Sequence, residues 1–271
     1  MFKLLSFFAL FCLAVFQIFP QSAILLLEGN YQGKNLFVQN QFGSGGVGFC
    51  VSEVLINGNV STDEIQSSAF EIDLKGQKLN LGDKVEIKIK HKADCKPRVL
   101  NPEVLKPKST YELVTINLSS DGTFSWSTKN ESGKLAYIVE QFRWNKWLKV
   151  GEIEGAGTPT EHSYTFKVSL HSGKNQVRVR QTDYTNIPHV SKSAEVNSSL
   201  CELEFSPVKV STSISFSCAA SKDPGSTLYE IYDQYGNLVK KGFGDKIDAG
   251  NLSKGGYYLN YDNKFGEFIK K

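Results

Sequence analysis

The pattern that most constrains this chain is an alternation of side chains with a period of two residues. In KVEIKIKHK, Val85, Ile87 and Ile89 alternate with charged residues, and in NQVRVRQTD, Val177 and Val179 alternate with arginines. Successive side chains of a strand point to opposite faces, so these segments predict strands with one buried and one solvated face. Gly- and Asn-rich turn signals separate them, and helical periodicity is missing. The sequence therefore predicts an all-β fold of three consecutive small antiparallel β-sandwich domains after a signal peptide.

The N-terminal segment has the features of an export signal. Lys3 is followed by the uncharged run LLSFFALFCLAVFQIF, which is too short for a stable membrane span, and PQSA offers a processing site near Ser22 or Ala23. We expect residues 1–23 to be a secretory signal peptide, with a retained N-terminal anchor as the alternative. Acidic and basic residues are interspersed and the formal net charge is only +3, so the chain lacks the charge pattern of a nucleic-acid-binding protein.

Proline content and composition shifts suggest the domain boundaries. Three prolines in CKPRVLNPEVLKPKST indicate an extended linker or edge segment, and SKSAEVNSS marks a second boundary. The expected domains are an N-terminal β-domain at 24–105, a second domain at 106–197 and a third at 198–271.

The cysteines suggest disulfides. Apart from Cys12 in the expected signal peptide, the chain has Cys50, Cys95, Cys201 and Cys218. An even number in an exported chain favours disulfide bonds, and the sequence separations suggest Cys50–Cys95 and Cys201–Cys218. A metal site is the alternative, because HKADC places His91 four residues before Cys95. The spacing lacks the paired motif of structural zinc, so no metal is expected.

Two segments are candidates for contact with a partner. The glycine cluster of residues 43–48, with Gly43, Gly45 and Gly46, precedes the strand-like FCVSEVLI. A phosphate-binding loop needs a following helix, so a surface loop is the better interpretation. The second segment holds the aromatic residues Phe142, Trp144 and Trp147. A sugar-binding platform and cross-strand or core packing are the alternatives for these three rings.

The middle of the chain has an ordered series of motifs. GTFSWST, with Trp126 placed as an inward-facing tryptophan, precedes AYIVEQFRWNKWLKVGEIEG, YTFKVSL and NQVRVRQTD. This order resembles a fibronectin type III sandwich, although RVRQTD lacks the tyrosine usual in a late strand of that family.

Three further motifs follow one another near the C-terminus. IYDQYGNLV covers Ile231–Val239, LSKGGY covers Leu252–Tyr257, and the chain ends in KFGEFIKK. Together they resemble the C-terminal β-domain of Bacteroidetes proteins that use the type 9 secretion system. Asp233 and Gly236 fit a turn, and Tyr257, Leu259 and Tyr261 alternate onto one face. The family's usual Tyr-Pro-Asn-Pro opening is replaced by FSPVKV between Cys201 and Cys218. A disulfide there would serve little purpose in a disposable export tag, so we expect this domain to be retained.

No established catalytic motif occurs in the sequence, and we expect no enzyme activity, catalytic residue, cofactor or small-molecule substrate. The layout of small β-domains with an altered C-terminal domain resembles the small plug subunits of SprA-type translocons. That resemblance implies a periplasmic component of the type 9 machinery, associated with an outer-membrane complex, that plugs a large SprA-like barrel when cargo is absent. The alternative is a cell-surface or secreted cargo protein that acts as an adhesin or binding module.

Overall fold

The computed structural model describes residues 22–220 and 225–271. These residues form β-strands, turns and one short 3-10 helix, η1, at Pro102–Leu105, and they contain no α-helix. The expected signal peptide lies outside the described residues, except that Ser22 and Ala23 begin the first strand. The chain divides into two compact units, and each is treated by itself below.

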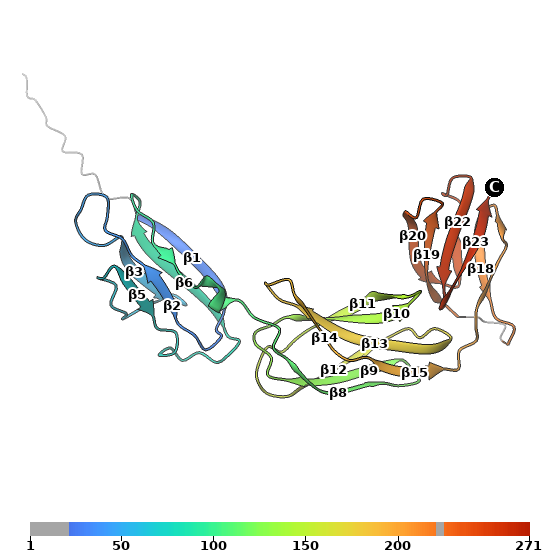
Figure 1. Cartoon of the computed structure of the whole chain (residues 1–271), viewed down its shortest axis with the longest axis horizontal. Helices are drawn as coiled ribbons and strands as arrows, with labels where there is room; N and C mark the ends of the chain where they lie inside the picture. The colour runs from blue at the N-terminus through green and yellow to red at the C-terminus, as the bar shows by residue number, and fades with distance from the viewer. Residues whose placement is uncertain (1–21, 221–224) are drawn as a thin grey trace, which may run out of the picture. The chain divides into compact units, whose positions relative to one another are not determined.

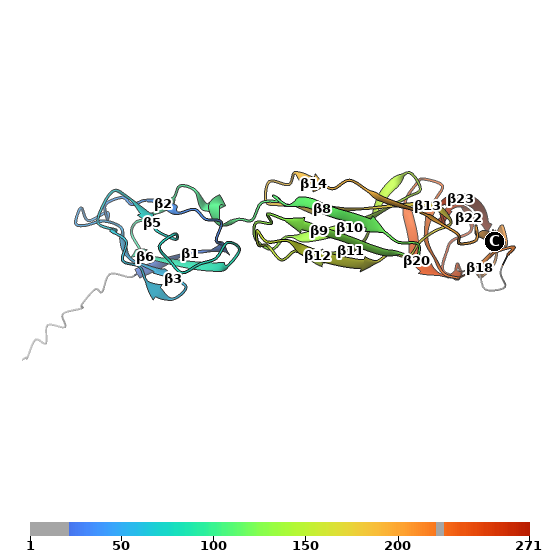
Figure 2. The same cartoon turned by 90° about the horizontal axis from the view of Figure 1, so that it is seen from below.

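The first unit includes Lys34–Gln77 and Val85–Glu103, and it is built around two sheets in separate layers (Figure 2). One sheet has the strand order β1-β6-β3-β4 and the other has the order β5-β2-β7. The expected alternation of Val85, Ile87 and Ile89 is confirmed, since all three are buried. The strands are β1 Ser22–Asn30, β2 Leu36–Gln39, β3 Val51–Ile56, β4 Asn59–Val60, β5 Ala69–Ile72, β6 Lys84–Lys92 and β7 Arg98–Val99.

The second unit contains residues 104–271 and begins with a central sandwich. Its sheets have the orders β12-β9-β8 and β11-β10-β13-β14, with β15 also pairing with β13. This is the fibronectin type III-like arrangement that the sequence predicts, and Trp126 is buried in its core. The strands are β8 Glu112–Leu118, β9 Thr123–Lys129, β10 Ala136–Arg143, β11 Lys146–Glu154, β12 His162–Lys167, β13 Gly173–Thr182, β14 Pro188–Val190 and β15 Ala194–Ser198.

A C-terminal sandwich completes the second unit, with β18 behind the sheet that contains β19, β20, β22 and β23 (Figure 1). The strand orders are β16-β18-β21 and β17-β23-β22-β19-β20. All pairs are antiparallel except β17 with β23, which is parallel. The strands are β16 Glu204–Ser206, β17 Lys209–Val210, β18 Ser213–Ser217, β19 Thr227–Asp233, β20 Leu238–Gly244, β21 Lys246–Asp248, β22 Gly255–Tyr261 and β23 Lys264–Lys270.

The C-terminal motifs take the local structure that the sequence predicts. The amide of Gly236, whose φ is 83°, donates to the carbonyl of Asp233 at 3.0 Å and closes the turn between β19 and β20. Tyr257, Leu259 and Tyr261 share one face and pack into the core. The last strand, β23, therefore lies between β17 and β22 rather than at an edge.

The compact units group the chain differently from the three expected domains, whose boundaries stay predictions. Residues 29–33 and 78–84, expected in the first domain, belong to the second unit, and the expected boundary at 197 lies inside that unit. Close main-chain packing explains the first difference, because a Cβ on Gly82 would lie 2.4 Å from the carbonyl oxygen of Gly157. The expected linker near residue 105 is partly the turn η1, since Leu105 is buried there.

Candidate functional site

The glycine loop of residues 43–48 is a hydrogen-bonded hairpin that precedes strand β3 of the first unit. The amide of Gly43 donates to the carbonyl of Gly48 at 3.0 Å, and the rings of Phe42 and Phe49 stack at a centroid distance of 4.4 Å. Lys92 Nζ donates to the Val47 carbonyl at 2.6 Å. The segment after the loop is strand β3 and not a helix, so the loop lacks the geometry of a phosphate site.

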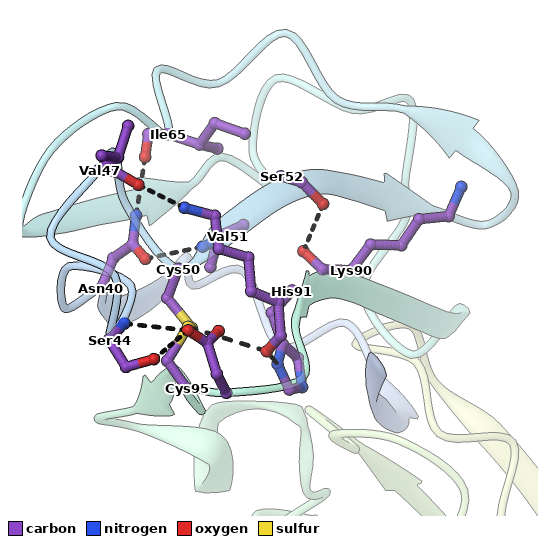
Figure 3. Close-up of a disulfide and its surroundings, with 12 residues drawn as sticks. Asn40, Ser44, Val47, Cys50, Val51, Ser52, Ile65, Lys90, His91 and Cys95 are labelled. Carbon is purple, nitrogen blue, oxygen red and sulfur yellow. Dashed lines mark hydrogen bonds between the residues drawn. A yellow bond between two sulfur atoms is a disulfide. The ribbon is translucent and has the colours of Figure 1, made fainter. Parts of the chain in front are cut away.

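A disulfide between Cys50 and Cys95 fastens the base of this loop (Figure 3). Asn40 is fully buried beside it, accepts from the Val51 amide at 3.0 Å and donates to the Ile65 carbonyl at 2.8 Å. The Cys50–Cys95 bond removes the thiol that a His91–Cys95 metal site would need. Cys201 and Cys218 form the second disulfide, in the C-terminal sandwich.

The aromatic segment surrounds the tip of the β10–β11 hairpin. The two turn residues, Trp144 and Asn145, both have positive φ, 52° and 59°. Asparagine tolerates this region, but a bulky side chain there is uncommon and strained. The Trp144 ring makes an intramolecular contact, because its Nε1 donates to the main-chain carbonyl of Tyr261 at 3.3 Å.

Phe142 and Trp147 face each other across the same hairpin, as the cross-strand packing interpretation predicts. Their rings meet edge to face at 5.3 Å, and the Arg178 guanidinium lies 3.9 Å from the Trp147 ring centroid. Arg178 and Arg180 both pair with the buried carboxylate of Glu140. These rings lie on the outer face of the sheet, since Arg178 alternates with the buried Val177 and Val179 along β13.

Arg143 joins the central and C-terminal sandwiches. The residue is completely buried, and it donates to Gln141 Oε1 at 2.8 Å, to the Ser169 carbonyl at 2.7 Å and to the Asp262 carbonyl at 3.0 Å. Burial lowers the pKa of Arg143 to about 10, although the nearby Asp262 carboxylate opposes that shift. The guanidinium remains charged at neutral pH and is satisfied by carbonyls from both sandwiches.

Asp262 is the matching residue on the C-terminal side. It occupies the β22–β23 turn with a φ of 47°, a conformation that aspartate tolerates better than most residues. Its carboxylate accepts from the Ser172 amide at 2.8 Å, from the Ser172 hydroxyl, and from the Leu203 amide at 3.4 Å. Two hairpin turns, one from each sandwich, are thus held together by buried polar groups.

His171 lies in the same junction. Its Nδ1 is 2.7 Å from the Ser172 carbonyl, which fixes the proton on that nitrogen, and its buried Nε2 has no hydrogen-bond partner among residues 22–220 and 225–271. Burial lowers the pKa of His171; the Ser172 carbonyl and Asp262 act against this shift, and Arg143 adds to it.

A second polar contact crosses the junction at its exposed side. Lys146 Nζ lies 2.6 Å from Glu230 Oε2 and 2.8 Å from the Tyr232 hydroxyl. Burial works against the charged form, but the bonds to Glu230 and Tyr232 outweigh it and raise the pKa of Lys146. The β10–β11 hairpin therefore covers part of the outer face of the C-terminal sheet.

Beside this contact a cleft of about 680 Å³ opens between the two sandwiches. Side chains of β10, β11 and β12 form one wall and side chains of β19 and β20 form the other. Its lining is mixed: apolar groups are Leu148, Val150, Phe166, Leu228 and Phe243, and charged groups are Lys149, Lys167, Lys241 and Glu230. A concave site of this volume at a domain junction can hold a ligand or a peptide segment.

The part of the chain that the structure describes contains no group of three or more His, Cys, Asp or Glu side chains placed to hold a metal ion. Within the same residues, no helix is long and apolar enough to cross a membrane.

The structure thus separates the candidate residues into different places. Gly43, Gly45 and Gly46 lie in the first unit, whereas Phe142, Trp144 and Trp147 lie at one hairpin of the second. Sequence reasoning missed Arg143 and Asp262. The available signal was the place of Arg143 in β10. The alternation of side chains along this strand predicts an inward-facing residue there, two positions after Gln141.

No protein-family model and no curated protein matches this chain. Among solved structures, a tetra-tandem repeat in the extending region of a large adhesion protein is 13% identical, with 92% of this chain and 73% of that chain covered and a TM-score of 0.31.

The fibronectin(III)-like modules of Clostridium thermocellum CbhA are 10% identical, over 59% of this chain and 93% of theirs, with a TM-score of 0.21. Dimeric latent PorU from Porphyromonas gingivalis is 13% identical, over 92% of this chain and 31% of that one, with a TM-score of 0.23. Likenesses this distant carry no conclusion about function.

Proposed function

We propose that this chain is an exported, non-enzymatic binding module in which the central and C-terminal sandwiches act as a single body. The observation that carries the proposal is the buried hydrogen bond from Arg143 to the carbonyl of Asp262, beside which the 680 Å³ cleft opens. A partner in the cleft meets side chains of both sandwiches at once. Sites of this kind are common at domain interfaces.

We also propose export by the type 9 secretion system, with the protein acting at the cell surface or after secretion. The motifs from Ile231 to the C-terminus support the route. The buried bonds of Asp262 support retention of the C-terminal domain, because its removal would leave the Arg143 guanidinium without one of its acceptors and the Ser172 amide without its carboxylate.

A finer proposal is a plug in an SprA-like translocon of the outer membrane. The same junction favours it, because a stopper must remain one folded body when cargo presses against it. In this role the protein acts on the periplasmic side and gives way when cargo arrives, which requires modest affinity.

Site-specific photocrosslinking in a Bacteroidetes host tests these proposals. A photoreactive residue replaces Phe243, which lines the cleft, and in the matched control it replaces the exposed Glu161. The binding module is supported if position 243 gives crosslinks and position 161 gives none, and if the intact mass of the protein still includes the C-terminal domain. A very large barrel protein as the crosslinked partner selects the plug, and a surface or secreted partner selects the adhesin. A mature mass that ends near residue 200 overturns the single-body function.

A further inference from the structure

The cleft of the second unit is surrounded by sheet edges. β11 ends the order β11-β10-β13-β14, β12 ends the order β12-β9-β8, and β20 ends the five-stranded sheet of the C-terminal sandwich. Residues of all three strands line the cleft. A strand at a sheet edge leaves a row of main-chain donors and acceptors available for another strand.

We propose that this cleft binds an extended segment of a partner protein that carries acidic and apolar side chains on one and the same face, and that the segment adds as a strand to the β20 edge. This inference rests on the proposed function as a binding module and names the chemistry of its partner.

The exposure of β20 supports its role as the receiving edge. Along this strand Leu238, Val239 and Phe243 have exposed fractions of 46%, 43% and 54%. The solvated face of an antiparallel sheet normally carries polar side chains, so exposed apolar groups on β20 mark an interaction site. β19 occupies one side of β20, and the register between them is interrupted by a bulge at Ile231/Tyr232.

The apolar lining fits one half of the incoming side chains. Phe243 of β20 lies directly opposite Leu228 of β19, and both side chains line the cleft. Opposite them, Leu148, Val150 and Phe166 come from β11 and β12. In an added strand every second side chain points to the same face, so apolar residues within the cleft-facing row would meet this lining.

The charges favour acidic residues at further positions of the same row, because Lys241 lies two residues before Phe243 and therefore on the same face of β20. Lys149, Lys167 and Lys241 line the cleft, and the one carboxylate that the described residues place there, Glu230, is already bonded to Lys146. Glu152 and Asp121 pair with Lys149 and Lys167, but these pairs are more than half exposed and such surface pairs are weak. A carboxylate of the partner can therefore bind the lysines at little cost.

The same lysines argue against a second copy of this chain as the occupant. Two β20 edges paired antiparallel about Lys241 would bring the two Lys241 side chains opposite each other, and like charges in that position are destabilising. Lysines on edge strands are a common device against such self-pairing.

Titration of the full mature chain with synthetic peptides tests the inference. The probes are an eight-residue peptide in which valine and glutamate alternate along one face and threonine occupies the other, its counterpart with lysine in place of glutamate, and the acidic peptide with one central proline. Calorimetry measures affinity, and hydrogen exchange followed by mass spectrometry locates the protected amides. The protein variants are Lys241→Glu and, as a matched control, Lys192→Glu on an exposed loop.

The acidic peptide is expected to bind and to slow exchange within Lys240–Gly244. Lys241→Glu and the proline peptide should each weaken binding by roughly tenfold, because one removes a charge contact and the other a ladder hydrogen bond. Lys192→Glu should leave the affinity unchanged. Equal binding of the lysine peptide, protection away from the cleft, or concentration-dependent dimerisation without peptide binding would overturn the inference. If cell crosslinks at position 243 persist while the acidic peptide fails, the partner chemistry is wrong but the binding function stands.

Discussion

The Nη1 of Arg143 donates a hydrogen bond of 3.0 Å to the main-chain carbonyl of Asp262, and both residues are buried. The two residues belong to different sandwiches, at the tips of the β10–β11 and β22–β23 hairpins. A buried charge requires a complete set of partners, so this contact exists only when both hairpins are in place. The central and C-terminal sandwiches are therefore energetically coupled.

Arg143→Leu should destabilise this junction by about 3 kcal/mol, because the carbonyls of Ser169 and Asp262 lose their buried donor. Calorimetry should show the C-terminal sandwich melting before the central one. Arg180→Leu is the matched control, since Arg180 lies on the outer face of β13. Equal effects of the two variants would contradict the coupling.

Stability should fall as the pH drops below about 6.5, the ordinary pKa of histidine. Burial lowers the pKa of His171 in the folded protein, so the unfolded chain binds more protons in that range and acid favours unfolding. A protonated ring would also lie beside Arg143.

Urea unfolding measured at several pH values between 5 and 8 checks this dependence. His171→Gln should flatten the curve below pH 6.5, whereas His162→Gln should retain the slope of the unmodified protein. An unchanged slope in His171→Gln would assign the pH dependence to other groups.

Glu131→Gln should cost about 2 kcal/mol of stability. The Glu131 carboxylate is buried and accepts from Thr128, Tyr137, Tyr164 and the Gly157 amide. Burial opposes its ionisation, but these bonds outweigh burial and lower the pKa of Glu131. An amide nitrogen in place of one oxygen cannot accept from them. The urea midpoint measures the loss, and the exposed Glu161→Gln should leave that midpoint unchanged.

Removal of the two disulfides should affect the compact units separately. The chain-entropy relation gives about 4 kcal/mol for Cys50–Cys95 and about 3 kcal/mol for Cys201–Cys218, whose sequence separations are 45 and 17 residues. Paired serine substitutions, followed by calorimetry, should lower only the transition of the unit that loses its bond. Recovery of four free thiols from the unmodified protein would refute both bonds.

Strand positions in this protein follow from local sequence. The alternation of Val85, Ile87 and Ile89, the turn from Asp233 to Gly236, and the inward tyrosines of β22 are each visible as patterns, because strand geometry puts successive side chains on opposite faces. The resemblance of the motif order to a fibronectin type III sandwich predicts Trp126 in the core. The pairing of Cys50 with Cys95 followed from an even count and a division between two parts of the chain.

The junction depends on tertiary structure alone. Arg143 and Asp262 are 119 residues apart, and neither belongs to a recognisable motif. Their contact requires two hairpin turns from different sandwiches to meet, which no local pattern encodes. The cleft has the same origin, because β11, β12 and β20 become neighbours only when sheet edges from both sandwiches converge. The sequence alone determined the strands, turns and inward faces through short-range geometry, whereas long-range packing decided which edges and which buried charges lie together.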